Sequence, residues 1–452
     1  MPGEPVDTIA AIATPRGNAG IGVIRLSGPD VPAILAKLTA KKIEPRRASL
    51  AKIYDSVNEL IDQVLVLYFP APHSFTGEHV IELQGHGGMV VMDMLLEHVI
   101  ALGCRQARPG EFSERAFLNG KIDLAQAEAI ADLIESHSRS AARGAMRSLQ
   151  GEFSTEVHAL VENLVHLRVL AEAYLDFPDE EIDEIPENEF SGRLDQIIDE
   201  TSDLLRRAGK GSLLRDGFHI VLAGRPNAGK SSLLNLLTRA DTAIVSSKAG
   251  TTRDIIRDRI DLDGMLIDLT DTAGLRHTDD EIEHEGVRRA TRELGNADHV
   301  LLIVDEADYS ESTRQELLEF IDPDIPVTII RNKIDLLDGV PAAKHQLDRI
   351  TEIMLSVKSG TGTDLLFDHL KSISSADSLG EGVFSARRRH IDALQRARVA
   401  LLDARKHIHP QLQLELLAED CRQAQNHLNE ITGEFGSEDL LGRIFSSFCI
   451  GK

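Results

Sequence analysis

The first 120 residues mix short apolar runs with two helical stretches. Runs of β-branched and alternating apolar side chains predict four strands, at 8–14, 20–26, 62–69 and 79–85. Apolar residues spaced three or four apart predict helices at 31–38 and 90–103. The pattern therefore indicates an α+β domain over residues 1–121.

From Ile122 the sequence changes to Leu, Ala, Glu and Arg at helical spacing, with few Gly or Pro residues until about Gly209. This change predicts the first part of a helical domain over 122–215. Helical spacing returns after a joint rich in Ser and Gly, which predicts the second part of the helical domain over 378–452.

Between these two parts, strands alternate with helices. The strand-like runs lie at 218–224, 265–271, 299–305 and 326–332. Such alternation is typical of a parallel sheet with crossover helices. We expect an α/β domain over 216–377, inserted into one helical domain whose two halves pack together.

The chain has 452 residues, 42% of them hydrophobic, which is enough apolar material for two to four domains. Its net charge of −24 repels nucleic acid, so any RNA contact must be a local basic patch. Three widely spaced cysteines argue against a disulfide framework and against a cysteine zinc site. Without a cationic, apolar leader or an apolar stretch of membrane-spanning length, the sequence predicts a soluble, cytoplasmic protein with no membrane contact.

The strongest motif is a phosphate-binding loop. Residues Gly224 to Ser231 read G-R-P-N-A-G-K-S between a predicted strand and a predicted helix, which is the context that the G-x-x-x-x-G-K-[ST] pattern requires. Backbone N–H groups and the helix N-terminus attract phosphates there, Lys230 adds a full positive charge, and Ser231 can ligate Mg²⁺. The alternative is a tight glycine turn with a surface lysine, and the motifs that follow in order weaken it.

Two of these motifs concern the phosphates and the metal. The segment S-S-K-A-G-T-T-R-D, from 246 to 254, offers Thr251 or Thr252 to close over Mg²⁺ as a switch. D-T-A-G at 271–274 ends a predicted strand, and it brings a carboxylate towards the metal and a flexible glycine to the position of a γ-phosphate.

Two further motifs concern the base. N-K-I-D, at 332–335, also ends a predicted strand, and Asp335 can accept hydrogen bonds from guanine N1–H and N2–H₂. Adenine lacks these donors and would leave a buried carboxylate unpaired, which excludes an adenine-specific ATPase. Ser356, Val357 and Lys358 stand where the last guanine-contacting loop is expected. The motifs together predict a GTP-binding domain.

Hydrolysis needs residues outside the usual Ras-like pattern. Leu275 follows D-T-A-G in place of the glutamine that orients water in such proteins, and the sequence assigns no arginine finger. Candidates for the missing role lie in the acidic loop from Arg276 to Glu283, most of whose carboxylates fit a solvated charge run equally well. A monovalent cation could supply the missing positive charge, with Asn227 as a neutral oxygen ligand.

The motifs, taken over the whole chain, resemble the MnmE (TrmE) family of tRNA-modifying GTPases. The resemblance rests on DTIAAIATPRGNAGIGVIRLSG, HSFTGEHVIELQGHGG, RPGEFSERAFLNGKIDLAQAEAIADLI, AYLDFPDEE, GRPNAGKSSLLN, AGTTRD, DTAGLR and the final FCIGK. It implies a folate-binding N-terminal domain that forms a homodimer, and a helical domain split by the GTPase domain. It also implies partnership with the flavoprotein MnmG in a heterotetramer, which modifies carbon 5 of the wobble uridine of certain tRNAs with a tetrahydrofolate one-carbon unit.

The resemblance also implies roles for individual residues. Potassium would be bound by Asn227, Ser246, Lys248 and Thr251, largely through backbone carbonyls, and Mg²⁺ by Ser231 and Thr252. The catalytic glutamate would be Glu283. 5-Formyltetrahydrofolate would be bound by Arg25, Glu82, Lys121 and Lys452, with the Cys449 thiol beside it. One departure is that many members read T-D-I-A-G-T-T where this chain reads S-S-K-A-G-T-T, which adds the charge of Lys248 near the expected cation.

The motifs and the resemblance together define the expected GTP contacts. These are Asn227, Ala228, Gly229, Lys230, Ser231, Ser232, Ser246, Ser247, Lys248, Ala249, Gly250, Thr251, Thr252, Asp271, Thr272, Ala273, Gly274, Asn332, Lys333, Asp335, Ser356, Val357 and Lys358. The alternative function is a regulatory GTP-binding switch in ribosome assembly, but the acidic chain shows no basic RNA module of the kind such a factor would carry.

Overall fold

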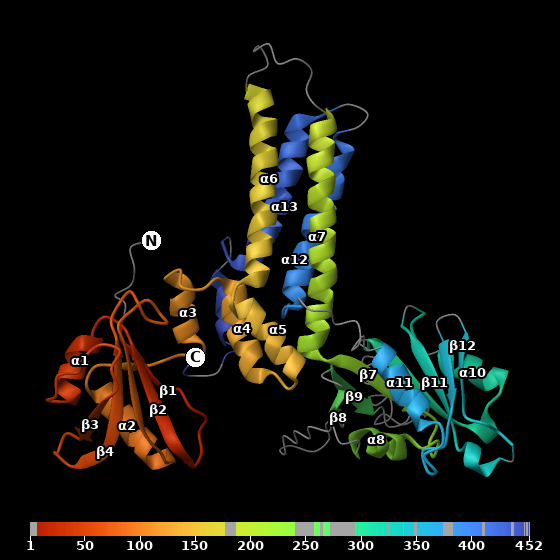
Figure 1. The fold of residues 1–452 in the computed structure, drawn as a ribbon, viewed down its shortest axis with the longest axis horizontal. Helices are drawn as coiled ribbons and strands as arrows, with labels where there is room; N and C mark the ends of the chain where they lie inside the picture. The colour runs from red at the N-terminus through yellow and green to blue at the C-terminus, as the bar shows by residue number, and fades with distance from the viewer. Residues whose placement is uncertain are drawn as a thin grey trace, which may run out of the picture. The chain divides into compact units, whose positions relative to one another are not determined.

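The computed structural model describes residues 7–176, 187–239, 257–262, 265–271, 294–295, 297–319, 321–323, 325–337, 339–347, 350–373, 383–408, 412–434, 438–446, 448 and 451. The chain forms two compact units. The first is formed from 1–131, 149–198 and 396–452, and the second from 132–148 and 199–395. The architecture is multidomain, with α+β, all-α and α/β parts as the sequence predicts (Figure 1).

The first unit contains a six-stranded sheet in the order β3-β4-β5-β2-β1-β6. Its strands are β1 (Ile9–Ile12), β2 (Ala19–Ser27), β3 (Ser49–Tyr54), β4 (Leu60–Phe69), β5 (Val80–Gly87) and β6 (Arg105–Gln106). The described pairings are antiparallel except for β1 with β6. The helices α1 (Val31–Leu38) and α2 (Met89–Ala101) bury Ile34 and Leu95 in one core with Ile24 and Leu83. The sequence predicted four of these strands and both helices, but it missed β3 and β6.

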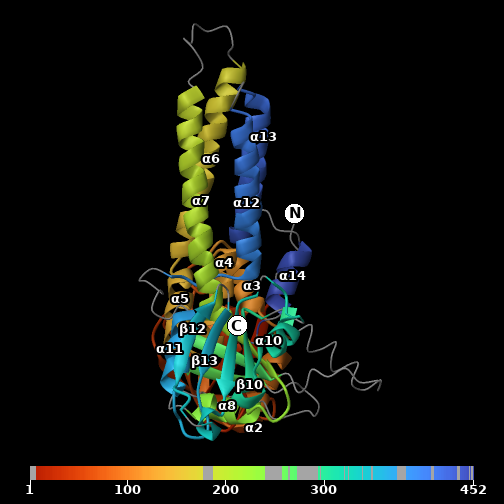
Figure 2. The same ribbon diagram turned by 90° about the vertical axis from the view of Figure 1, so that its right-hand side faces the viewer.

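Helices complete the first unit. They are α3 (Glu111–Leu118), α6 (Glu152–Asp176), α13 (Leu414–Thr432) and α14 (Glu438–Ser446), with parts of α4 (Leu124–Glu135), α7 (Glu187–Asp216) and α12 (Arg388–Lys406). Figure 1 and Figure 2 both show α6 beside α13, and Arg168 of α6 donates to Gln425 of α13 at 2.7 Å. Residues separated by some 250 positions thus form one bundle, as expected for a helical domain whose two parts pack together. No helix in the described ranges is long and apolar enough to span a membrane.

The helical stretch predicted after Ile122 is not continuous. α4 ends at Glu135, and a separate helix α5 (Arg139–Leu149) follows. The break has a local cause, because the Ser138 hydroxyl accepts a hydrogen bond from the Ala141 N–H at 3.1 Å and so starts a new helix.

The second unit contains a seven-stranded sheet in the order β12-β13-β11-β10-β7-β9-β8. Its strands are β7 (Phe218–Gly224), β8 (Arg257–Leu262), β9 (Met265–Asp271), β10 (His299–Asp305), β11 (Val327–Asn332), β12 (Ala343–Leu347) and β13 (Ile350–Met354). The helices α8 (Lys230–Arg239), α10 (Glu311–Leu318) and α11 (Thr363–Ile373) connect or cover them, and α11 packs Leu366 and Leu370 against the sheet.

The sheet is parallel only in its centre. β8 pairs with β9, and β12 with β13, in antiparallel fashion. In both pairs the strands are joined through only two residues, whereas parallel neighbours need a crossover of roughly a dozen residues or more. The expectation of a parallel sheet therefore holds for the five central strands and is wrong for the two edges.

One buried polar cluster lies inside this second unit. The Thr328 hydroxyl of β11 lies 2.8 Å from His299 Nε2 of β10 and 2.7 Å from His369 Nε2 of α11. Both imidazoles are buried. Burial lowers the pKa of His299 to about 4, with a further contribution from His369, and burial also lowers the pKa of His369 to about 4. The neutral rings can share the hydroxyl because it donates to one nitrogen and accepts from the other.

Candidate functional site

The phosphate loop connects the end of β7 with the start of α8. Gly224 has φ +146°, and a Cβ there would lie 2.1 Å from the Ile303 carbonyl oxygen. Gly229 has φ +110°, and a Cβ there would lie 2.4 Å from Asn332 Nδ2. Both positions therefore require glycine for conformation and for space. Lys230 begins α8, and its ammonium donates to the carbonyls of Gly224 (2.7 Å) and Arg225 (3.1 Å), which holds the charge over the loop.

Asn332 links the phosphate loop to the loop expected to contact the base. Its Nδ2 donates to the Ala228 carbonyl at 2.8 Å, and its Oδ1 accepts from the Val357 N–H at 3.0 Å. Asn332 is itself buried. One amide at the end of β11 therefore fixes two loops that are more than one hundred residues apart in sequence.

The expected guanine-binding residues lie on one open cavity of about 640 Å³. Ser356 donates to the Asp335 carboxylate at 2.6 Å and accepts from the Ser359 N–H at 3.1 Å, so the carboxylate is oriented by a hydroxyl that is itself held by the backbone. The cavity is lined by Asn227, Gly229, Ser232, Asn235, Leu236, Asn332, Lys333, Asp335, Leu336, Ser356, Val357 and Lys358. The structure thus brings the two ends of the predicted nucleotide site together.

Sequence reasoning missed one ionic contact that supports this cavity. Lys333 has a left-handed backbone (φ +69°), and its ammonium lies 2.7 Å from Asp305 at the end of β10. Burial raises the pKa of the Asp305 carboxyl, but hydrogen bonds from Lys333 and the Ala307 N–H outweigh burial and lower it overall. The signal was available, because Asp305 ends a parallel strand at the same sheet edge as the phosphate loop.

Other predicted nucleotide and metal contacts lie outside the described residues. These are Ser246, Ser247, Lys248, Ala249, Gly250, Thr251, Thr252, Thr272, Ala273, Gly274 and the proposed catalytic Glu283. Of D-T-A-G only the backbone of Asp271 is described, where it ends β9 and pairs with Leu222 of β7. Ser231 and Ser232 lie in the first turn of α8, directly after Lys230. The switch, metal and catalytic assignments therefore stay predictions.

A second group of predicted site residues lies on the six-stranded sheet. Arg25 on β2 is paired in register with Ala11 on β1 and with Glu82 on β5. Arg25 donates from Nε (3.0 Å) and Nη2 (2.9 Å) to Glu82 Oε1. The guanidinium also lies 6.0 Å from the Phe75 ring centroid and 5.8 Å from that of Phe112. The two predicted folate contacts are therefore partners of one another, and their charges are largely balanced before any ligand binds.

Lys121 is connected to the same surface through a loop. A Cβ on Gly77 would lie 3.3 Å from Lys121 Cε, so the lysine side chain packs directly over this glycine. The preceding residue of that loop, Thr76, shares a 2.7 Å hydrogen bond with Ser27, which is two positions beyond Arg25 on β2. The side chain of Lys121 thus packs against a loop that is anchored to the strand of Arg25.

The segment from Phe448 to Gly451 returns to this sheet. Gly451 has φ +95°, and a Cβ there would lie 2.4 Å from the carbonyl oxygen of Ile12, the residue after the register partner of Arg25. Phe448 and Phe445 are buried against Leu124 in one apolar cluster. Cys449 and Lys452 lie outside the described residues, whereas the backbone of Gly451 lies beside Ile12 of β1.

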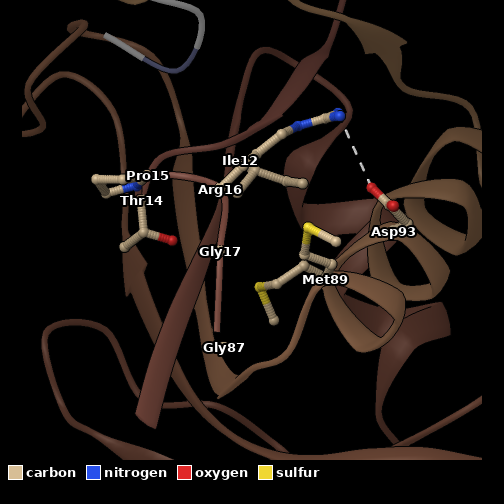
Figure 3. A pocket seen from close by; sticks show the side chains of 9 residues that line it. Ile12, Thr14, Pro15, Arg16, Gly17, Gly87, Met89 and Asp93 are labelled. Atoms are coloured by element: carbon tan, nitrogen blue, oxygen red, sulfur yellow. Dashed lines mark ion pairs between the residues drawn. The ribbon is translucent and has the colours of Figure 1, made fainter. Parts of the chain in front are cut away.

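A small cavity lies at the same end of β1 (Figure 3). It is lined by Ile12, Thr14, Pro15, Arg16, Gly17, Gly87, Met89, Met92 and Asp93, and Arg16 lies 3.9 Å from Asp93 across it. Its volume of about 30 Å³ suits a water-sized occupant and excludes a pterin. Arg25 and Glu82 lie on β2 and β5, and neither these two residues nor Lys121 line the cavity.

Comparison with known proteins gives two family matches. The model for the GTP-binding protein TrmE N-terminus matches residues 8–121, and the model for the MnmE helical domain matches residues 124–449. A tRNA modification GTPase MnmE from Pseudomonas fluorescens is 53% identical, and one from Saccharophagus degradans is 51% identical; each alignment covers 99% of both chains.

Among solved structures, Aquifex aeolicus Era bound to GDP and aluminium fluoride is 24% identical over 41% of this chain and 66% of its own. The TM-score is 0.28, a value too low to support an argument about the fold.

Proposed function

The chain belongs to the MnmE (TrmE) family of tRNA modification GTPases, and from this premise we propose that it acts on the wobble uridine of certain tRNAs. It hydrolyses GTP as its relatives do. In the proposed reaction it works with the flavoprotein MnmG, as a cytoplasmic homodimer within a heterotetramer. The pair attaches an aminomethyl or carboxymethylaminomethyl group to carbon 5, using a tetrahydrofolate one-carbon unit, while GTP turnover drives dimerisation of the GTPase domains.

The observation that carries the GTPase part is the link through Asn332. Its amide donates to the Ala228 carbonyl of the phosphate loop and accepts from the Val357 N–H of the base loop, and residues of both loops line one cavity. Asp335, held by Ser356, then presents a carboxylate to the two N–H groups that distinguish guanine from adenine. GTP fits this cavity, whereas the adenine of ATP would offer this carboxylate neither of the two N–H groups.

The chain offers suitable oxygen ligands for the expected cations. The Ser231 hydroxyl follows Lys230 at the start of α8, and together with Thr252 it would hold Mg²⁺, which neutralises phosphate charge. Asn227 has a left-handed backbone (φ +60°) in the phosphate loop, and with the carbonyls of Ser246, Lys248 and Thr251 it would hold K⁺. The bound K⁺ would supply the positive charge that an arginine finger gives in related enzymes.

These assignments predict a specific kinetic pattern. GTP hydrolysis should be faster in KCl than in NaCl at equal ionic strength, and Glu283→Ala should lower kcat much more than it weakens GTP binding. Equal rates in the two salts would remove the potassium assignment but leave GTP binding by Asp335 intact.

The folate part of the proposal is supported by the approach of three segments to one surface. Arg25 and Glu82 form a pair on adjacent strands, Lys121 packs over Gly77 of the neighbouring loop, and Gly451 lies against β1. Lys452, the next residue, would add a cation for the glutamate tail of 5-formyltetrahydrofolate, while Glu82 accepts from pterin N–H groups. Deleting 448–452 should abolish folate binding and wobble modification but leave GTP hydrolysis unchanged.

The whole proposal is tested by mass spectrometry of tRNA nucleosides from cells that lack this chain. Loss of the modified wobble uridines, restored by the intact gene, is the expected result. If the nucleosides stay unchanged and ribosomal subunit profiles shift instead, the regulatory switch in ribosome assembly is the correct function.

A further inference from the structure

Helix α5 carries an unusual charge distribution for this acidic chain. It has three arginines, Arg139, Arg143 and Arg147, and no acidic residue, although the whole chain has a net charge of −24. Arg139 and Arg143 are exposed, and Arg147 is partly exposed. We call these three residues the arginine face of α5.

The arginine face is not neutralised from within the described part of the chain. No hydrogen bond, ion pair or ring contact joins any of its three guanidiniums to another described residue. Three exposed arginines on other helices, Arg193, Arg206 and Arg422, differ in this respect, because each pairs with an acidic residue three or four positions away. Such pairs partly neutralise the charge of an exposed arginine, whereas the described residues leave the guanidiniums of α5 open to an anion from outside the chain.

The opposite side of α5 is fixed by close packing. Ala141, Gly144, Ala145 and Ser148 are buried, and they lie about half a turn away from the arginines. Ser148 donates to the Ser385 carbonyl at 2.8 Å, and the Ser385 N–H donates to the Gly144 carbonyl at 3.1 Å. The helix therefore cannot rotate its arginines inward without breaking this contact.

The residue type favours a phosphate ligand over an acidic protein surface. A spacing of four residues places the guanidiniums in a row, about 6 Å apart along the helix axis. Arginine offers a planar fork that binds phosphate in bidentate fashion, and the face contains no lysine. The centre of a protein interface usually carries aromatic or apolar anchors, but Met146, 41% exposed, is the one large apolar side chain that α5 exposes.

We propose that the arginine face of α5 binds the sugar–phosphate backbone of the tRNA and orients it for modification. This inference rests on the proposed tRNA-modifying function. Backbone contacts fix position and carry no sequence information. A single basic row on an acidic protein would hold the RNA at one place, because the surrounding negative charge repels it elsewhere.

The first test measures binding of a fluorescein-labelled tRNA transcript to the full chain by anisotropy, between 50 and 200 mM KCl. Replacing Arg139, Arg143 and Arg147 with Gln preserves length and helix propensity. The triple variant should bind about tenfold more weakly or worse, and the slope of log affinity against log salt should fall by about 2 to 3. The matched control replaces Arg193, Arg206 and Arg422 with Gln, and it should bind like the wild type.

The results separate the possible explanations. Equal affinity and slope for both triple variants would overturn the inference, as would failure of the wild-type chain to bind the transcript. GTP hydrolysis and thermal unfolding should match the wild type in both variants, so that a folding defect is recognised as such.

The second test asks whether the arginine face serves the reaction in cells. The arginine-face variant is expressed in cells lacking the chain, and wobble nucleosides are measured. Reduced modification together with weak tRNA binding supports the inference. Full modification by the variant would overturn the inference. It would leave the proposed function intact, provided that cells without the chain lose the modification. Unchanged nucleosides in the cells without the chain would instead refute the proposed function. Reduced modification with normal tRNA binding would assign the face to a protein partner.

Discussion

The two candidate sites are built in different ways. The nucleotide cavity lies at the carboxyl ends of parallel strands, where Asn332 and Asp335 follow β11 and the phosphate loop follows β7. The N-terminal site takes Arg25 and Glu82 from within two antiparallel strands, and it adds a loop and Gly451, which is distant in sequence. The cavity is open and keeps Asp335 accessible, whereas Arg25 and Glu82 already satisfy one another.

This difference predicts how each site responds to change. An open site with a dedicated polar contact depends strongly on that contact, because the choice of base rests on one carboxylate, that of Asp335. In a site assembled from paired charges and a docked segment, replacing one residue should weaken ligand binding less, since the other residues keep their contacts. The following experiments test this contrast, from the largest expected effect to the smallest.

The largest effect is expected from Asp335→Asn. The amide presents a donor to guanine N2–H₂ and loses the charge, so GTP affinity should fall by about a thousandfold. Xanthosine triphosphate, with a carbonyl at C2, should bind better than GTP. Competition binding with GTP, ATP and xanthosine triphosphate checks this expectation. If intact protein binds ATP as well as GTP, the assignment of Asp335 is wrong.

The stability of the two units should also depend differently on pH in the acid range. Burial lowers the pKa of His299 and His369 to about 4, from 6.5. Unfolding lets these rings take up protons, so the stability they confer is complete above about pH 6.5 and is lost as pH falls towards 4. Over that pH range, one such histidine lowers the free energy of unfolding by about 3 kcal/mol.

The ion pair between Asp7 and Arg105 in the first unit should keep its contribution to stability down to a lower pH. A hydrogen bond from Arg105 is the main cause that lowers the pKa of Asp7 to about 2, while burial opposes it. The stability from Asp7 is present above pH 3.8 and is lost as pH falls towards 2. Hydrogen exchange, corrected for intrinsic rates, should therefore show the second unit opening first between pH 6 and 4. His369→Gln, which cannot titrate, should weaken this pH dependence; an unchanged profile would contradict the assignment.

Some of this arrangement could be predicted from sequence, and some could not. The phosphate loop, N-K-I-D and the loop at Ser356 were found because each directly follows a strand of recognisable pattern. The bond from Asn332 to Ala228 could not be predicted, because it depends on which strands become neighbours in the sheet. The Arg25–Glu82 pair depends in the same way on the antiparallel register of β2 and β5, which lie more than fifty residues apart. Contacts across a sheet leave no local pattern.

The third prediction concerns Asn332→Ala. The change leaves the Ala228 carbonyl and the Val357 N–H without their side-chain partner, and it disconnects the phosphate loop from the base loop. We expect a loss of about 2 kcal/mol in GTP binding free energy. Asn235 lines the same cavity, so Asn235→Ala controls for the loss of an amide at the cavity wall and should change binding much less. Calorimetry with GDP compares the two variants, and equal losses would show that the bridge is unimportant.

The smallest change in stability is expected from Gly451→Ala, although its effect on folate should be clear. A Cβ at Gly451 would meet the Ile12 carbonyl oxygen at 2.4 Å, so the segment must move away from β1. Gly451 lies outside the apolar cluster in which Phe448 is buried, and the free energy of unfolding should change by less than about 1 kcal/mol. Gly103→Ala introduces a side chain at a similarly positive φ, but its Cβ meets nothing within 4 Å, so it controls for backbone strain. Calorimetry with 5-formyltetrahydrofolate should show weaker binding for Gly451→Ala alone, while GTP binding stays constant in both. Folate binding that survives this displacement would show that Arg25, Glu82 and Lys121 form the site without the 448–451 segment.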